Sequence, residues 1–140
     1  MINKDMARDY MNRSARCLKE AEIALSDNDA PMVIRRSQES LELGTKALLR
    51  AMAIEYPREH DVTDALIANR KKLPESLGSR IDELVRLVTE LASVRGPAFY
   101  GYESEGVPAS RAFSIDYATG VLNSVRELVA IISNELAKVL

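Results

Sequence analysis

The stretch from Ser93 to Tyr102 combines one arginine with three aromatic rings. Phe99, Tyr100 and Tyr102 are three of only seven aromatic residues in the chain. Arginine holds phosphate through a planar fork of donors, and a tyrosine ring can stack on a nucleobase. These residue types predict a ligand-facing site at Arg95, Tyr100 and Tyr102. The alternative is a tight turn whose rings fill the end of a helix bundle, because buried aromatic residues are commoner than ligand-binding ones.

Three further groups of polar residues offer weaker candidates. Glu42 and Lys46 lie four residues apart on a predicted helix, where they form either a supporting surface ion pair or one wall of a ligand cleft. His60 is either a general base or proton donor, or a loop residue that orders the start of the next helix. The basic clusters Arg35–Arg36 and Arg70–Lys72 are more typical of solvated faces than of a nucleic-acid patch.

The composition argues against metal and cofactor chemistry. The chain has one histidine and one cysteine, Cys17, far apart in sequence, and such a pair cannot form a zinc site. It also lacks the paired Glu-x-x-His motif of di-iron bundles and the glycine-rich loop of nucleotide-binding folds. We therefore expect neither a metal nor a cofactor.

Length and charge fit a single soluble domain over residues 1–140. Hydrophobic residues make up 46% of the 140 positions and charged residues 29%. The net charge of −2 argues against binding to duplex DNA, which usually needs a basic face. A single cysteine excludes an internal disulfide, and the sequence contains no apolar run of membrane-spanning length and no signal peptide. These features predict a cytoplasmic protein without membrane contact.

Apolar residues recur at helical spacing along almost the whole chain, and strand-like alternation is absent. We expect long helices over residues 5–25, 31–54 and 74–94, a short helix over 63–70 that Asp61 or Thr63 caps, and an irregular stretch over 95–113. A last long helix, capped by Ser114 or Asp116, should reach Leu136. The pattern predicts an all-α fold, an antiparallel up-and-down bundle of four long helices plus one short helix.

Two features of these predicted helices concern packing. Gly44 lies among the small residues Ser40 and Ala47, which favours close approach of a neighbouring helix as the reason for a glycine inside a helix. The last helix has a broad apolar stripe, and such a stripe indicates contact with more than one neighbour. The stripe is explained either by a homodimer or by a central position of this helix within one chain.

Three segments in order, Ser37–Leu49, Tyr56–Val62 and Val94–Tyr102, resemble the HEPN domain family of prokaryotes. The resemblance extends over residues 8–136. It implies an all-helical up-and-down bundle that usually forms homodimers and is linked to nucleotides and RNA. Many members are metal-independent ribonucleases or the toxins of toxin–antitoxin pairs, often encoded beside a small nucleotidyltransferase.

The resemblance also implies roles for individual residues. Active members carry an arginine and, a few residues later, a histidine after the penultimate long helix. Arg95 matches the arginine, whereas the histidine position holds Tyr100; Glu42 and Lys46 match a Glu-x-x-x-Lys pattern of the family. A phenol stays protonated at neutral pH, so it is a poor general base, and loss of such a base costs roughly 10²–10⁴ in rate.

Three functions therefore follow as hypotheses. The first is a nucleotide- or RNA-binding homodimer with impaired or absent ribonuclease activity. The second is a protein-interaction module that pairs with a nucleotidyltransferase-type partner. The third is an active metal-independent ribonuclease toxin, which would need either a lowered tyrosine pKa or His60 brought to the site.

Overall fold

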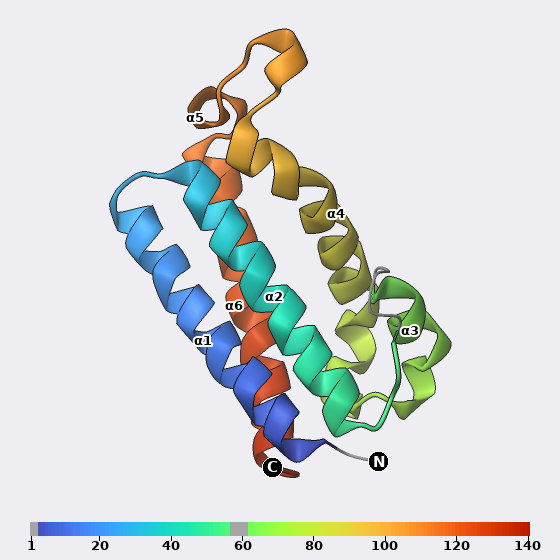
Figure 1. Ribbon diagram of the computed structural model, residues 1–140. Coiled ribbons are helices and arrows are strands. Elements are labelled where there is room, and N and C mark those ends of the chain that lie inside the picture. The colour runs from blue at the N-terminus through green and yellow to red at the C-terminus, as the bar shows by residue number, and fades with distance from the viewer. Residues whose placement is uncertain (1–2, 57–61) are drawn as a thin grey trace.

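Figure 1 shows the computed structural model, which describes residues 3–56 and 62–140. Four long helices run alternately up and down, which confirms the predicted all-α bundle. His60 and Asp61 lie outside the described residues. The long helices are α1 (Lys4–Ser26), α2 (Ala30–Ala51), α4 (Ile81–Tyr100) and α6 (Ile115–Ala137). The short elements are α3 (Thr63–Ala68), α5 (Ala109–Ala112) and the 3₁₀ segments η1 (Arg70–Lys72), η2 (Glu75–Arg80) and η3 (Glu103–Glu105).

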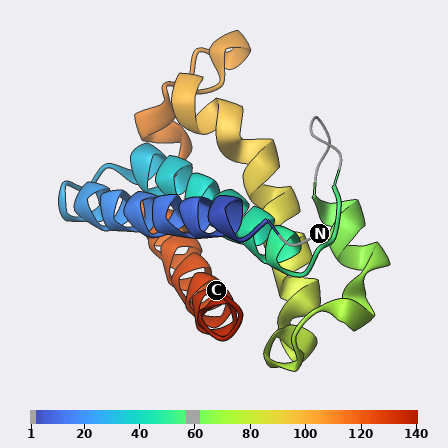
Figure 2. The ribbon, with the colours of Figure 1, turned by 60° about the horizontal axis from the view of Figure 1, so that its bottom comes forward.

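Helix α2 is the central element of the bundle. It packs against α1, α4 and α6, and Figures 1 and 2 show α1 and α4 on opposite sides of it. Its fully buried large side chains are Ile34, Leu41, Leu48 and Leu49. Because apolar burial is the main driving force of folding, these contacts make α2 the main contributor to the core that the four long helices share.

Side-chain caps set the starts of three long helices. The carboxamide of Asn3 accepts a hydrogen bond from the Met6 amide at 3.0 Å, and the Asp29 carboxylate accepts one from Met32 at 3.3 Å. Ser114 accepts one from the Tyr117 amide at 3.1 Å, which confirms the serine alternative for the last helix. Each cap satisfies an amide that has no partner inside its helix.

Small residues allow α1 and α2 to approach each other closely. The Ser14 hydroxyl donates to the Ser40 carbonyl oxygen at 2.6 Å, and the Ser40 hydroxyl donates to the Ser14 carbonyl oxygen at 2.9 Å. One turn further along α2, a Cβ atom on Gly44 would lie 3.2 Å from Ser14 Oγ and 3.7 Å from Val129 Cγ2. Close packing on two sides therefore explains the glycine inside α2.

Several predicted boundaries were wrong. Helix α4 begins at Ile81 rather than Pro74, and it continues to Tyr100 although we expected it to end at Val94. Pro97 lies inside its last turns, because the fixed φ angle of proline suits a helix and only one backbone hydrogen bond is lost so close to the end. The stretch over 95–113, expected to be irregular, thus contains the end of α4 together with η3 and α5. Likewise, α2 ends at Ala51, and Val62 rather than Thr63 precedes α3.

The broad apolar stripe of α6 is used within the chain. Its buried residues, among them Leu122, Leu128 and Ile132, pack on α2, and the helix also contacts α1 and η2. A central position therefore accounts for the stripe, and the stripe gives no separate support for a dimer. In the described part of the chain no helix combines the length and the apolarity needed to cross a membrane.

The close approach at Gly44 predicts a large effect of added volume. Gly44→Val should lower the free energy of unfolding by about 1–3 kcal/mol, because the new methyl groups must displace Ser14 and Val129. Gly120→Val is the matched control, since nothing lies within 4 Å of a Cβ atom there; we expect a change below about 0.5 kcal/mol. Urea denaturation of both variants measures the difference. Equal effects at the two positions would contradict the close-packing account of Gly44.

Candidate functional site

The candidate site lies where α4 ends, beside the first turns of α2. Arg95 is exposed on the last turns of α4, and two neighbouring rings are also exposed, Phe99 by 56% and Tyr100 by 64%. Their rings meet edge to face with centroids 4.7 Å apart. These rings do not fill the end of the bundle, so the alternative of a buried aromatic plug is wrong for Phe99 and Tyr100.

Gly101 directs the chain away from α4 just after Tyr100. Its φ angle is +75°, and a Cβ atom there would lie 2.3 Å from the Val107 carbonyl oxygen, so only glycine fits. The backbone of Tyr102 then pairs with that of Val107, with N···O distances of 2.8 and 3.0 Å in the two directions. The result is a small closed loop that projects from the end of the bundle (Figure 1).

A row of rings connects this loop to α6. Tyr102 is 41% exposed and lies 6.3 Å from Phe113, which lies 6.2 Å from Tyr117 on α6, measured between ring centroids. The Tyr117 hydroxyl donates to the Glu90 carboxylate of α4 at 3.0 Å. Burial, and next this hydrogen bond, raise the pKa of Tyr117 to about 12. The Tyr102 ring is therefore held between solvent and a fixed aromatic support.

Arg35 of α2 attaches the end of α4 to the centre of the bundle. Its Nη1 atom donates to the Arg95 carbonyl oxygen at 3.1 Å, and its guanidinium lies 4.9 Å from the centroid of the Phe99 ring. The Nε atom donates to Glu39 at 3.3 Å. The predicted solvated basic face is therefore wrong for Arg35, because the residue is half-buried and links two helices.

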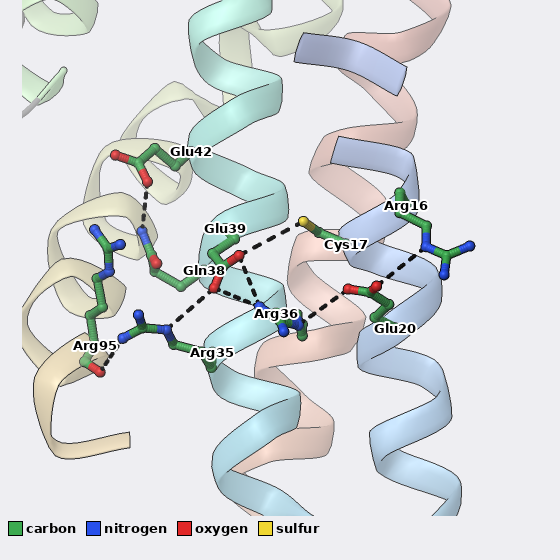
Figure 3. Close-up of polar contacts among 9 residues, drawn as sticks. All are labelled: Arg16, Cys17, Glu20, Arg35, Arg36, Gln38, Glu39, Glu42 and Arg95. Atoms are coloured by element: carbon green, nitrogen blue, oxygen red, sulfur yellow. Dashed lines mark hydrogen bonds and ion pairs between the residues drawn. The ribbon is translucent and has the colours of Figure 1, made fainter. Parts of the chain in front are cut away.

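Figure 3 shows that the charge of Arg35 is shared in a network across α1 and α2. Arg36 binds Glu39 at 3.0 Å on its own helix and Glu20 of α1 at 3.2 Å. The Cys17 sulfur lies 4.0 Å from Glu39, and burial, followed by the charge of Glu39, raises the pKa of this thiol. Three arginines, Arg16, Arg35 and Arg36, share the carboxylates of Glu20 and Glu39 in this network. Arg95, in contrast, has no carboxylate partner in the described part of the chain.

Gln38 and Glu42 continue the same face of α2 toward Lys46. Gln38 is 6% exposed and donates to Glu42 at 3.3 Å, and Glu42 binds Lys46 at 3.5 Å, which confirms the predicted ion pair. The Gln38 Oε1 atom is buried and accepts no hydrogen bond in the described part of the chain. In Figure 3 the Arg95 side chain extends from α4 toward the level of Gln38. A buried acceptor without a donor costs about 1–3 kcal/mol, and because the Gln38 Oε1 atom is buried it is not open to a ligand in this structure.

The structure thus brings together some of the predicted site residues and separates others. Arg95, Tyr100 and Tyr102 occupy one end of the bundle. Lys46 lies eleven residues after Arg35 on α2, which corresponds to roughly 16 Å along the helix axis, and it faces a different pocket. Glu42 lies between the two. Sequence reasoning named Arg35 only as part of a basic cluster and did not single out Gln38, although positions 35, 38, 42 and 46 follow helical spacing and form a polar stripe.

The chain is an all-α, up-and-down bundle that carries an arginine and tyrosines at the end of its penultimate long helix. A family model described as HEPN domain matches residues 7–136, so the chain belongs to the HEPN domain family. Neither a curated protein nor a solved structure matches the chain. Membership supports an association with nucleotides or RNA in general terms.

The described side chains of this site offer groups that can recognise a ligand. Histidine is absent from residues 3–56 and 62–140, so the described site holds an arginine and phenols but no imidazole. The described residues also contain no group of three or more histidine, cysteine or acidic side chains that could hold a metal ion. Arginine can bind phosphate, and exposed tyrosine rings can stack on bases.

The link between Tyr117 and Glu90 predicts a pH effect on stability. Because the folded state raises the pKa of Tyr117 to about 12, it holds the phenolic proton more tightly than the unfolded chain does. The resulting stabilisation is complete below the ordinary tyrosine pKa near 10 and is lost as the pH rises to about 12. Tyrosinate absorbance should show one tyrosine that titrates last, and Tyr117→Phe should remove that step. An unchanged titration in Tyr117→Phe would contradict this assignment.

Proposed function

We propose that this HEPN domain binds single-stranded RNA or nucleotides through Arg95, Tyr100 and Tyr102, with little or no RNA cleavage. The observation that carries this proposal is the Arg95 guanidinium, which is exposed and has no hydrogen-bond or ion-pair partner among the described residues, while the exposed Tyr100 ring lies on the same last turns of α4. A structural arginine would instead be expected to pair with a carboxylate, as Arg35 and Arg36 do.

Each of these residues supplies one part of the recognition. Arg95 offers a planar set of N–H donors that can bind a phosphate at two points. Tyr100 and Tyr102 present rings to solvent, and stacking of a base on an aromatic ring contributes about 1–3 kcal/mol.

Cleavage of RNA without a metal needs a group that removes the proton of the 2′-hydroxyl. In the motif of active HEPN members a histidine follows the arginine, and in this chain Tyr100 occupies the position of that histidine. The ordinary pKa of a phenol lies near 10, so at neutral pH very little of it is in the basic form that could remove this proton. Binding without efficient cleavage follows from this substitution.

We extend the proposal to a homodimer, since HEPN domains often dimerise. A second candidate function is pairing with a nucleotidyltransferase-type protein. The exposed rings of Phe99 and Tyr100 favour it, because protein interfaces are enriched in aromatic residues. The two functions are distinguished by whether Arg95 is needed for RNA binding or whether a protein copurifies at fixed stoichiometry without nucleotide.

Removal of the free guanidinium should weaken RNA binding. Arg95→Ala should lower the affinity for single-stranded RNA by about tenfold or more, because a charge-assisted hydrogen bond contributes about 1.5–3 kcal/mol. The salt dependence of binding should also fall by about one phosphate contact. Arg86→Ala is the matched control, since Arg86 is also exposed on α4. Fluorescence anisotropy measures both, and unchanged affinity in Arg95→Ala would refute the proposed site.

Restoring the histidine should restore catalysis. Tyr100→His places an imidazole five positions after Arg95 on an exposed turn, and the rate of RNA cleavage should rise by about 10²–10⁴. Tyr100→Phe should bind RNA but show no gain. Cleavage of a labelled RNA at pH 6 to 9 without metal gives the rates. Efficient cleavage by the unchanged protein, abolished by Arg95→Ala, would instead establish an active ribonuclease.

A further inference from the structure

A pocket lies at the end of the bundle opposite to Arg95, where α1 begins and α2 ends. Its volume is about 500 Å³, and its lining includes Met6, Tyr10, Lys46, Arg50 and Tyr56. This volume falls within the range of roughly 300–1,000 Å³ that is usual for small-molecule sites. The pocket shares no residue with the end of α4, so it is independent of the function proposed for Arg95.

Arg50 lies in this pocket between two tyrosine rings. Its guanidinium carbon is 5.5 Å from the centroid of Tyr10 and 5.7 Å from that of Tyr56, and its Nε atom donates to the Tyr56 hydroxyl at 3.1 Å. No carboxylate among the described residues forms an ion pair with Arg50. The two rings fix the plane of the guanidinium while its positive charge is left without an anionic partner.

Lys46 places a second cation one turn away on the same helix. Its Nζ atom lies 5.9 Å from the centroid of Tyr56 and 3.5 Å from a Glu42 oxygen. The Tyr56 hydroxyl accepts the hydrogen bond from Arg50, so its own proton is available to a ligand oxygen. Among the described residues of the lining, Glu55 alone is acidic, and it is exposed.

We propose that this pocket binds a small phosphate-bearing anion, with Arg50 as the principal phosphate ligand. A fixed guanidinium, a nearby ammonium and a hydroxyl donor match the tetrahedral oxygens of phosphate, and arginine binds such oxygens at two points. The volume leaves space beside the phosphate for a sugar-sized group, whose ring can lie along Met6 and Tyr10.

Inorganic phosphate and ribose 5-phosphate are suitable probes for the full chain. A heteronuclear NMR titration that follows the Arg50 Nε–H resonance should show saturable shifts with both anions and none with ribose. Tighter binding of ribose 5-phosphate indicates a sugar phosphate, and equal binding indicates free phosphate; either result supports a phosphate site. The absence of a saturable shift with both anions would overturn the proposal.

Variants then locate the bound phosphate. Backbone amide resonances of the pocket residues serve as the readout for the variants, because substitution of Arg50 removes its Nε–H signal. Arg50→Gln should weaken phosphate binding by about tenfold or more, and Arg50→Lys should weaken it less because it keeps the charge but loses the planar fork. Arg86→Ala, on an exposed position of α4, should leave the affinity unchanged. A loss of binding in Arg95→Ala with unchanged binding in Arg50→Gln would overturn this proposal while supporting the site on α4.

Two milder substitutions keep the test decisive if Arg50→Gln does not fold. Lys46→Gln removes one positive charge and should weaken phosphate binding by several-fold, whereas Glu55→Gln removes the negative charge of the lining and should strengthen it. Identical affinities of these two variants would contradict a phosphate site in this pocket, because they differ in charge by two units at the same pocket.

Discussion

The contact between α1 and α2 is the constraint on which the rest of the structure depends. Ser14 and Ser40 exchange hydrogen bonds through hydroxyl and carbonyl groups that are fully buried, and Gly44 leaves no side chain between the helices. A polar contact of this kind has a defined geometry, unlike apolar packing, so it fixes the register of α1 along α2. The faces that α2 presents to α4 and α6 follow from that register.

Charge on α2 is arranged according to the same register. Arg35 and Arg36 both bind Glu39, yet they point to different neighbours, α4 and α1 respectively (Figure 3). One carboxylate therefore binds two cations that contact two different helices, and Glu20 of α1 supplies a second negative charge to Arg36. The Arg95 guanidinium has no corresponding partner among the described residues, which is the physical reason for assigning it to a ligand rather than to the scaffold.

The sequence predicted the number and order of the long helices because apolar spacing along each of them is regular. It failed near Arg95, since proline and glycine were taken as the end of a helix, whereas Pro97 is tolerated in the last turns of α4 and Gly101 marks the true end. The family motif also grouped Lys46 with Arg95 in one site, but Lys46 lies near the end of α2 that is remote from Arg95. The exposure of Phe99 and Tyr100 depends on packing between distant segments, which local patterns do not contain.

The closed loop after Gly101 has a consequence for the thermodynamics of recognition. The backbone pairing between Tyr102 and Val107 and the contact of the Tyr102 ring with Phe113 already restrict the conformations of the free loop. A partner that docks on this loop then loses little chain entropy there, so more of the contact energy is retained as affinity. Such preorganisation also favours fast association, because no slow rearrangement of the loop has to precede docking.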